Sequence, residues 1–275
     1  MTKNLIVIAR LECLSVARLK WMRMLTAAFA LLAAAGAYSA GAAGELSGAD
    51  GFARTTLALI PIALILVPLA AVILGVSGQA TEPGSESFLF TQPVHRATVV
   101  LGRWAGEAAA LGGAIAAGFG IGMLVVVFGS GIKGISQYAF FVVATLALGA
   151  IFLSLASVIS AATDSRAVAL GIATFVWFFF VLLYDGLALS AAGWTGGLVG
   201  GRVLFGSVLA NPVDLIRVLM LTLPGTSGVL GAAGEAWIRY MGGDMSAWLI
   251  ATGVLMSWIF APLLVAVSVL GRRDL

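Results

Sequence analysis

Charged residues are scarce in this chain. Only 10% of its 275 residues are Asp, Glu, Lys or Arg, while 61% are hydrophobic; a soluble domain carries roughly 25% charged residues. The apolar residues fall into runs of about 20, a length that crosses a hydrocarbon core of about 30 Å as a helix. The composition excludes a water-soluble domain and predicts an all-α membrane protein.

Residues that bind metals or form disulfides are nearly absent. A single Cys excludes an internal disulfide, and a single His, at position 95, leaves no histidine cluster for zinc or haem. We therefore expect no metal and no cofactor on this chain. The net charge of +3 is what the cytoplasmic loops of a membrane protein supply, so it does not imply nucleic acid.

The chain also lacks a phosphate loop. None of its three lysines, Lys3, Lys20 and Lys133, follows a Gly, so the Gly-Lys-Ser/Thr core of nucleotide-hydrolysing chains is missing. Charges inside the apolar runs are few as well. We expect Glu107 in the first turn of the third run and Asp185 near the outer end of the fifth, either at the interface or lining a path. Any transport would need energy from another chain.

Six transmembrane helices are expected from the apolar runs. Their predicted ranges are Trp21–Gly41, Leu57–Ser77, Trp104–Phe128, Tyr138–Ala161, Ala167–Ser190 and Ala247–Leu270. Two long polar segments remain between them, 79–103 and 191–246. We expect function to reside in these two segments of a single transmembrane domain, 1–275.

The basic residues predict how the spans face. One set of loops and span ends carries ten Lys and Arg residues and the alternate set carries five. Because retained positive charge marks the cytoplasm, both termini should be cytoplasmic. Residues 1–20 fit a helix lying in the cytoplasmic interface or an ordinary juxtamembrane basic cluster. A cleaved signal peptide is the rival interpretation of the start, and we expect no cleavage.

Small residues recur every fourth position along the third span. They are Gly102, Gly106, Ala110, Ala114, Gly118 and Gly122. Such a strip lets another helix pack closely, although an Ala- and Gly-rich chain also produces it by chance. Prolines in the second and sixth spans, Pro61, Pro68 and Pro262, predict kinks there.

The segment from Glu82 to Arg103 carries the most specific pattern in the chain. It contains, in order, Glu82, Gly84, Ser85, Phe88, Leu89, Thr91, Pro93, Val94, Arg96, Val99, Val100, Gly102 and Arg103. In order and spacing these residues resemble the cytoplasmic coupling segment of type V ABC exporter permeases. The resemblance implies a coupling helix between spans 2 and 3 that contacts a separate ATPase. It places ATP and Mg²⁺ on that partner and makes this chain a transmembrane subunit rather than an enzyme.

The same segment has a physical interpretation. A short helix that projects Phe88 and Leu89 can fill a groove on a cytoplasmic partner, and Pro93 ends that helix. Arg96 and Arg103 then lie near anionic headgroups or acidic groups of the partner. A merely solvated loop rarely carries such an apolar block between charges.

Other segments are similar to one branch of that family. Val176–Asp185 and Asn211–Arg217 are similar to the fifth span and outer loop of permeases that assist copper-site assembly in nitrous oxide reductase. This resemblance implies export of a sulfur- or copper-related factor from a homodimer with two ATPases in the bacterial inner membrane. A generic exporter of a drug, lipid or peptide remains an alternative, as does a membrane enzyme or scaffold unrelated to ABC transport.

The outer segment 191–246 also has a local pattern. Asn211 and Pro212 can start a helix as cap and first turn, and Val203–Leu223 is expected to dip into the outer interface as re-entrant helices. The residues predicted to meet an extracytoplasmic accessory protein are Asn211, Asp214, Arg217 and Trp237. Simple capping and anchoring in the lipid interface is the alternative for the same residues.

The predicted topology can be measured by labelling. In a Cys13→Ser background, we expect a cysteine at position 95 to react only with reagent added to the cytoplasmic side. A cysteine at position 133 should react only from outside. The reverse pattern would overturn the assignment of the loops.

Overall fold

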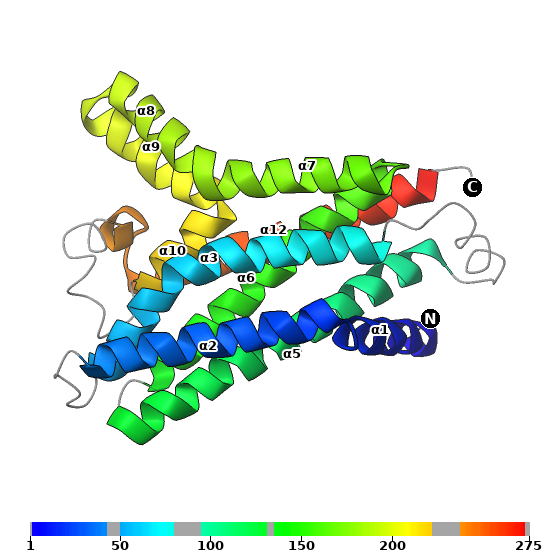
Figure 1. Cartoon of the computed structure of the whole chain (residues 1–275). Coiled ribbons are helices and arrows are strands. Elements are labelled where there is room, and N and C mark those ends of the chain that lie inside the picture. Colours follow the sequence, from blue (N-terminus) through cyan, green and yellow to red (C-terminus); the bar gives the residue numbers. More distant parts are fainter. Residues whose placement is uncertain (1, 43–49, 80–94, 131–134, 222–236, 273–275) are drawn as a thin grey trace.

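The computed structural model describes residues 2–42, 50–79, 95–130, 135–221 and 237–272. Within these residues all regular elements are helices. Their bounds are α1 Thr2–Ala17, α2 Lys20–Ala42, α3 Asp50–Gln79, α5 Arg96–Ser130, α6 Ile135–Ala162, α7 Arg166–Phe178, the π-helix η1 Phe179–Leu183, α8 Tyr184–Thr195, α9 Gly197–Ala210, α10 Pro212–Leu221 and α12 Asp244–Arg272. The long helices run along a common direction, and both termini lie at the same end of the bundle (Figure 1).

Within the described residues, six helices are long and apolar enough to span a membrane, as expected. Their spanning ranges are Lys20–Tyr38, Thr55–Gly78, Arg96–Phe128, Ile135–Ala162, Arg166–Thr195 and Met245–Arg272. The third begins at Arg96 instead of Trp104, because the residues between them continue the same helix. Glu107 is therefore not in the first turn of α5, and it is fully buried.

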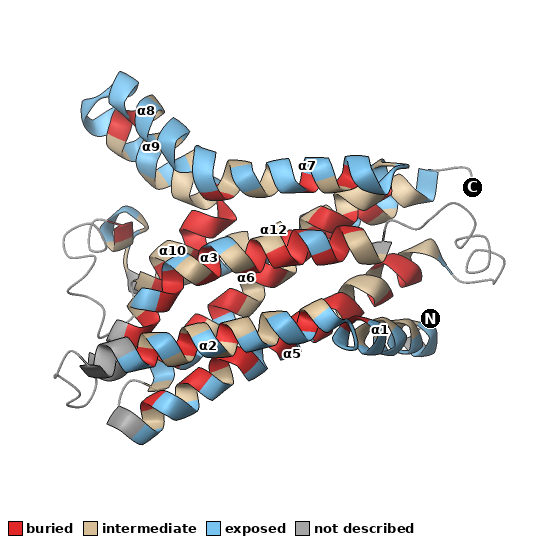
Figure 2. Ribbon diagram, viewed as in Figure 1, coloured by how far each residue is buried: buried red, intermediate tan, exposed pale blue. Residues whose placement is uncertain are grey.

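Helix α6 forms the centre of the bundle. It contacts α3, α5, α7, α10 and α12, and buried residues line its faces toward them (Figure 2). A helix that is apolar all round, as α6 is, belongs inside a bundle rather than at its edge. The rest of the molecule is arranged around this element.

An aromatic cluster joins α2, α5 and α6. The ring of Phe119 stacks on Phe29 at 5.1 Å between centroids and meets Phe141 edge-on at 5.0 Å. The Tyr138 hydroxyl, which is buried, donates a 2.9 Å hydrogen bond to the Phe119 carbonyl. Aromatic pairs of this geometry add roughly 0.5–1.5 kcal/mol beyond burial.

The small-residue strip of α5 packs against two helices, which confirms its predicted role. A Cβ atom added at Gly118 would stand 2.5 Å from the Phe29 Cβ atom and 2.9 Å from the Thr26 carbonyl oxygen, both in α2. Gly122 approaches Ala33 of the same helix even more closely. Glycine is therefore required here for the two backbones to pack.

The fifth span is interrupted and then turns back. Five residues, Phe179–Leu183, form a π-helix between α7 and α8, and α8 continues into a hairpin with α9 that extends away from the bundle (Figure 1). Gly196 and Gly197 make the turn with φ of 61° and 48°, which glycine adopts without strain. Helix α9 thus begins at Gly197, six residues before the predicted start at Val203.

Helices α9 and α10 form a second bend. Their axes meet at 101°, and together they are apolar and long enough for a broken span or a re-entrant loop. The bend falls at Asn211, and α10 begins at Pro212. The Val213 N–H donates to the Asn211 side-chain oxygen at 3.0 Å, so the predicted cap is confirmed.

The glycine strip makes a prediction with an internal control. Gly118→Ala should destabilise the protein by about 1–3 kcal/mol, because the added methyl group overpacks the contact with α2. Gly120→Ala, two residues away, meets no atom within 4 Å and should stabilise by up to about 1 kcal/mol through helix propensity. Thermal denaturation of both variants in the same detergent measures the difference. Equal melting temperatures would contradict this packing.

Candidate functional site

The predicted coupling residues fall into two groups. Glu82, Gly84, Phe88, Leu89 and Pro93 lie outside the described residues. The other three, Arg96, Gly102 and Arg103, lie in the first turns of α5.

Arg96, the first residue of α5, holds the end of the last span. Its Nη1 atom donates to the Leu270 carbonyl at 2.8 Å and approaches the Gly271 carbonyl at 3.4 Å. The last carbonyls of a helix have no partner within it, and a guanidinium is well suited to bind them. The N-terminal end of α5 is thereby tied to α12.

Gly102 and Gly106 hold the N-terminal helix against α5. A Cβ atom at Gly102 would stand 2.9 Å from the Ile8 side chain, and one at Gly106 would stand 2.5 Å from the Ala9 carbonyl oxygen. Helix α1 therefore lies directly on the α5 backbone. Gly102, which is predicted to take part in coupling, thus contacts α1 of the same chain.

Two carboxylates meet where α1, α3 and α5 converge. The side chains of Glu12 and Glu107 both approach the position that a Cβ atom would take at Gly78, so a larger residue there would displace them. Burial raises the pKa of Glu12, and the positive charge of Arg103 opposes this shift. Arg103 thus stabilises the ionised carboxylate at the N-terminal helix.

A cavity of about 700 Å³ opens beside Glu12. Its walls come from α1, α3 and the starts of α2 and α7, and include Trp21, Ser77, Gly78 and Arg166. One acidic and one basic side chain face the same space.

At the opposite end Asn211 organises a polar cluster. Its side-chain nitrogen donates to the Phe180 carbonyl at 3.0 Å and to the Asp214 carboxylate at 2.9 Å. The Phe180 carbonyl is available because the Tyr184 N–H bonds to Phe179 in the π-helix register. The π-helix therefore supplies the acceptor that fixes α10 against the fifth span.

Arg217 bridges two carboxylates of this cluster. Its Nη1 atom lies 2.8 Å from Asp185 and 2.9 Å from Asp214. The Asp214 side chain is 12% exposed, against 45% for Asp185. A buried carboxylate depends strongly on its cation, while an exposed ion pair contributes roughly 0–1 kcal/mol. Asp214 is therefore the partner of Arg217 that matters more for stability.

Arg217 also separates two cavities. One, of about 350 Å³, has Asp185, Asp214, Phe205 and Trp237 in its wall. The other, of about 450 Å³, is lined by apolar residues of α3, η1 and α10. Arg217 lines both cavities.

The four residues predicted to meet an outer partner are brought together, but mostly inside the chain. Asn211, Asp214 and Trp237 are buried, and the side chain of Arg217 is 35% exposed. Exposed apolar residues lie instead on the α8–α9 hairpin, where Trp194 is 91% exposed. A contact between the four residues and an accessory protein stays a prediction.

Two partners of this cluster were missed from the sequence. The spacing of Asp214 and Arg217, three residues apart on one helix, suggests a pair. Nothing local connects Asp185 to Arg217, 32 positions later. The π-helix register at Phe180 likewise has no visible sequence signal.

The comparisons with known proteins agree with this architecture. The family model described as "ABC-2 family transporter protein" matches residues 6–275. The chain belongs to this family. Two relatives share its full extent, both named as a probable ABC transporter permease protein NosY. The protein from Stutzerimonas stutzeri is 30% identical over 277 residues, covering 97% of each chain. The one from Pseudomonas aeruginosa PAO1 is 29% identical over 279 residues, covering 98% of each.

This ABC-2 chain is therefore the permease subunit of an ABC transporter. It is a transmembrane subunit rather than an enzyme, and ATP hydrolysis belongs to a separate ATPase subunit. The alternative of a membrane protein unrelated to ABC transport is excluded. The resemblance seen in the coupling segment is confirmed at the level of the family.

The outer cluster predicts a difference between two polar substitutions. Asn211→Ala removes the bonds to Phe180 and Asp214 together with the cap of α10, and should cost about 2–3 kcal/mol. Asp185→Asn leaves Arg217 paired with Asp214 and should cost under about 1 kcal/mol. Melting temperatures of the two purified variants measure this order. A larger loss for Asp185→Asn would contradict the central role of Asn211.

Proposed function

We propose that this permease exports a sulfur- or copper-related factor used to assemble the copper site of nitrous oxide reductase. The observation that carries the proposal is the similarity to two NosY permeases along nearly the whole chain. It agrees with the resemblance of Val176–Asp185 and Asn211–Arg217 to permeases of that role. Export of a drug, lipid or peptide is the alternative within the family.

We further propose a bacterial inner-membrane location with both termini in the cytoplasm. The basic residues support this orientation, with ten Lys and Arg on one side and five on the other. Helix α3 ends and α5 begins at the same end of the bundle as the termini (Figure 1). The ATPase would then meet this end. The polar cluster around Arg217 faces the outside.

The working unit proposed is a homodimer with two ATPase subunits. The described residues of one chain contain six candidate spans, half the number of an exporter of the type it resembles. ATP-driven closure of the ATPases would push on the segment that precedes Arg96. Because Arg96 holds the end of α12 and Gly106 holds α1, the push would move three helices as one body.

At the outer end, the α7–α9 path would change shape in response to this push. The π-helix and the turn at Gly196 and Gly197 are the departures from regular helix along the α7–α9 path, and π-helices frequently occur at functional sites. An extracytoplasmic accessory protein would dock on the exposed hairpin, where Trp194 and Leu198 are exposed. The predicted contact residues Asn211, Asp214, Arg217 and Trp237 would support that surface from below.

One set of variants tests the proposal. Cells that depend on this permease should assemble copper-loaded nitrous oxide reductase, measured from the absorption spectrum of the purified enzyme. The double variant with Phe88→Asp and Leu89→Asp should fail to do so and should lose copurified ATPase, because the apolar anchor is removed.

The matched control places two acids at exposed positions of the α6–α7 turn, at the same end of the bundle. Ala162→Asp with Ser165→Asp should keep both the ATPase and the copper site. Full copper loading without the permease would disprove the maturation role. Retained coupling in the Phe88 and Leu89 variant would disprove the anchor alone.

A further inference from the structure

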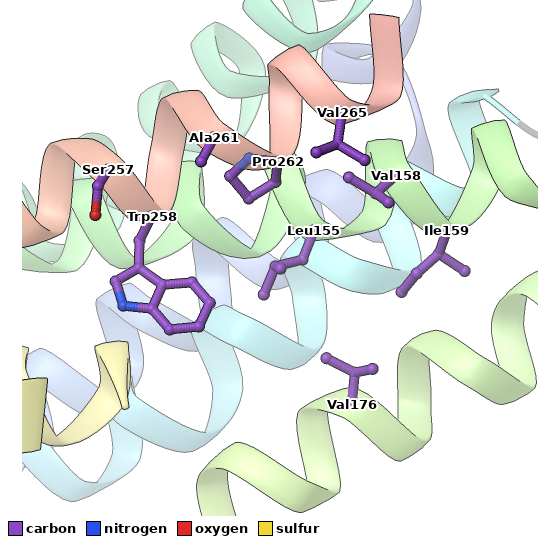
Figure 3. A pocket seen from close by; sticks show the side chains of 9 residues that line it. All are labelled: Leu155, Val158, Ile159, Val176, Ser257, Trp258, Ala261, Pro262 and Val265. Carbon is purple, nitrogen blue, oxygen red and sulfur yellow. The ribbon is translucent and has the colours of Figure 1, made fainter. Parts of the chain in front are cut away.

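An apolar groove runs between α7 and α12, with α6 as its floor. Both outer helices pack on α6, and the space between them has a volume of about 490 Å³. Figure 3 shows side chains from all three helices pointing into this space. They are Leu155, Val158, Ile159, Val176, Ser257, Trp258, Ala261, Pro262 and Val265.

The wall of the groove is mostly hydrocarbon, and its polar side-chain groups are the Ser257 hydroxyl and the Trp258 indole N–H. Its one aliphatic hydroxyl, on Ser257, donates to the Val254 carbonyl at 2.7 Å within α12. Trp258 packs its ring edge-on against Phe180 at 5.5 Å between centroids, next to the π-helix. A polar cargo would find few hydrogen-bond partners along this surface.

The groove extends through about one half of the membrane thickness. From Ser257 to Val265 the α12 wall rises by about 12 Å at 1.5 Å per residue, close to half of a hydrocarbon core of about 30 Å. At the α6 wall, Ile159 lies three residues before the end of the helix at Ala162. The groove therefore extends from the end that carries the termini to about the midplane.

Positive charge lies above the mouth of the groove. Arg272 follows Val265 by seven residues and Ala261 by eleven, two spacings that return to the same face of a helix, and it is exposed. Arg96 binds the carbonyls of Leu270 and Gly271 beside it. The α6–α7 turn adds Asp164 and Arg166, one charge of each sign, so among the described residues the mouth keeps an excess of positive charge.

We propose that this groove binds one acyl chain of an anionic phospholipid, with the headgroup at Arg272. An acyl chain is linear and apolar, which suits the mostly hydrocarbon wall, and the membrane supplies it along the open side of the groove. The guanidinium at the mouth matches a phosphate and its extra negative charge. If a second copy of this chain filled the groove instead, the positive charge at the mouth would have no matching negative charge. The proposal rests on the membrane-spanning fold and not on the cargo of the transporter.

Lipid titration of the intact complex tests the site. The complex of permease and ATPase is first freed of bound lipid in detergent. It is then titrated with phosphatidylglycerol or phosphatidylcholine of one chain length, and bound lipid is counted by native mass spectrometry. Wild type should retain phosphatidylglycerol with the higher affinity. Ala261→Phe should weaken this binding about tenfold or more, because the ring displaces methylenes from the groove.

Matched variants separate the groove from the general lipid surface. Val158→Phe fills the same space from α6 and should act like Ala261→Phe. The test therefore needs only one of these two variants to fold. Leu264→Phe changes a residue of α12 that is 70% exposed and outside the groove, and should leave binding unchanged. Arg272→Ala should lower the preference for phosphatidylglycerol about fivefold while phosphatidylcholine binds as before.

Three results would overturn the proposal. The first is unchanged lipid affinity in a folded variant with Phe at 261 or 158. The second is loss of the second permease copy from that variant without loss of lipid, which would make the groove an interface between copies. The third is an unchanged lipid preference after Arg272→Ala.

Discussion

Polar groups within a membrane must find their partners inside the protein, and this requirement organises the whole bundle. Water cannot bind an exposed donor in the hydrocarbon region. The described helices meet the requirement with side chains that donate to backbone carbonyls of another helix. Tyr138 reaches Phe119, Trp177 reaches Ile65, and Asn211 reaches Phe180, at 2.9, 3.1 and 3.0 Å. Each bond fixes the rotation of one helix against its neighbour.

The same requirement explains why the two ends of the bundle differ. At the end with the termini, glycines bring α1 and α5 into backbone contact, and Arg96 binds the last carbonyls of α12. Such contacts tolerate little sliding, because close-packed surfaces resist deformation. At the other end, an arginine shared by two carboxylates and a π-helix allow more than one arrangement of bonds. Tight backbone packing and a shared arginine are thus placed at opposite ends of the same bundle.

Much of this could be predicted from the sequence, because the deciding signals are local. Apolar runs gave the six spans, and the Asn211–Pro212 pair gave the start of α10 with its cap. The start of the third span was missed, since hydropathy ends at Trp104 while the helix continues to Arg96. The coupling role of Arg96 remains a prediction, but its bond to Leu270 joins residues 174 positions apart. No local pattern encodes such a contact.

Asp185 shows the limit of reasoning from one residue at a time. Its place near the outer end of the fifth span suggested either an interfacial anchor or a path-lining group. In the fold it shares Arg217 with the more buried Asp214, and Arg217 borders two cavities. Because one guanidinium pairs with two carboxylates, weakening its ion pair with one carboxylate strengthens its ion pair with the other. The chemistry of this end therefore belongs to the three residues together, and it requires the π-helix, since Asn211 holds α10 in place through the Phe180 carbonyl.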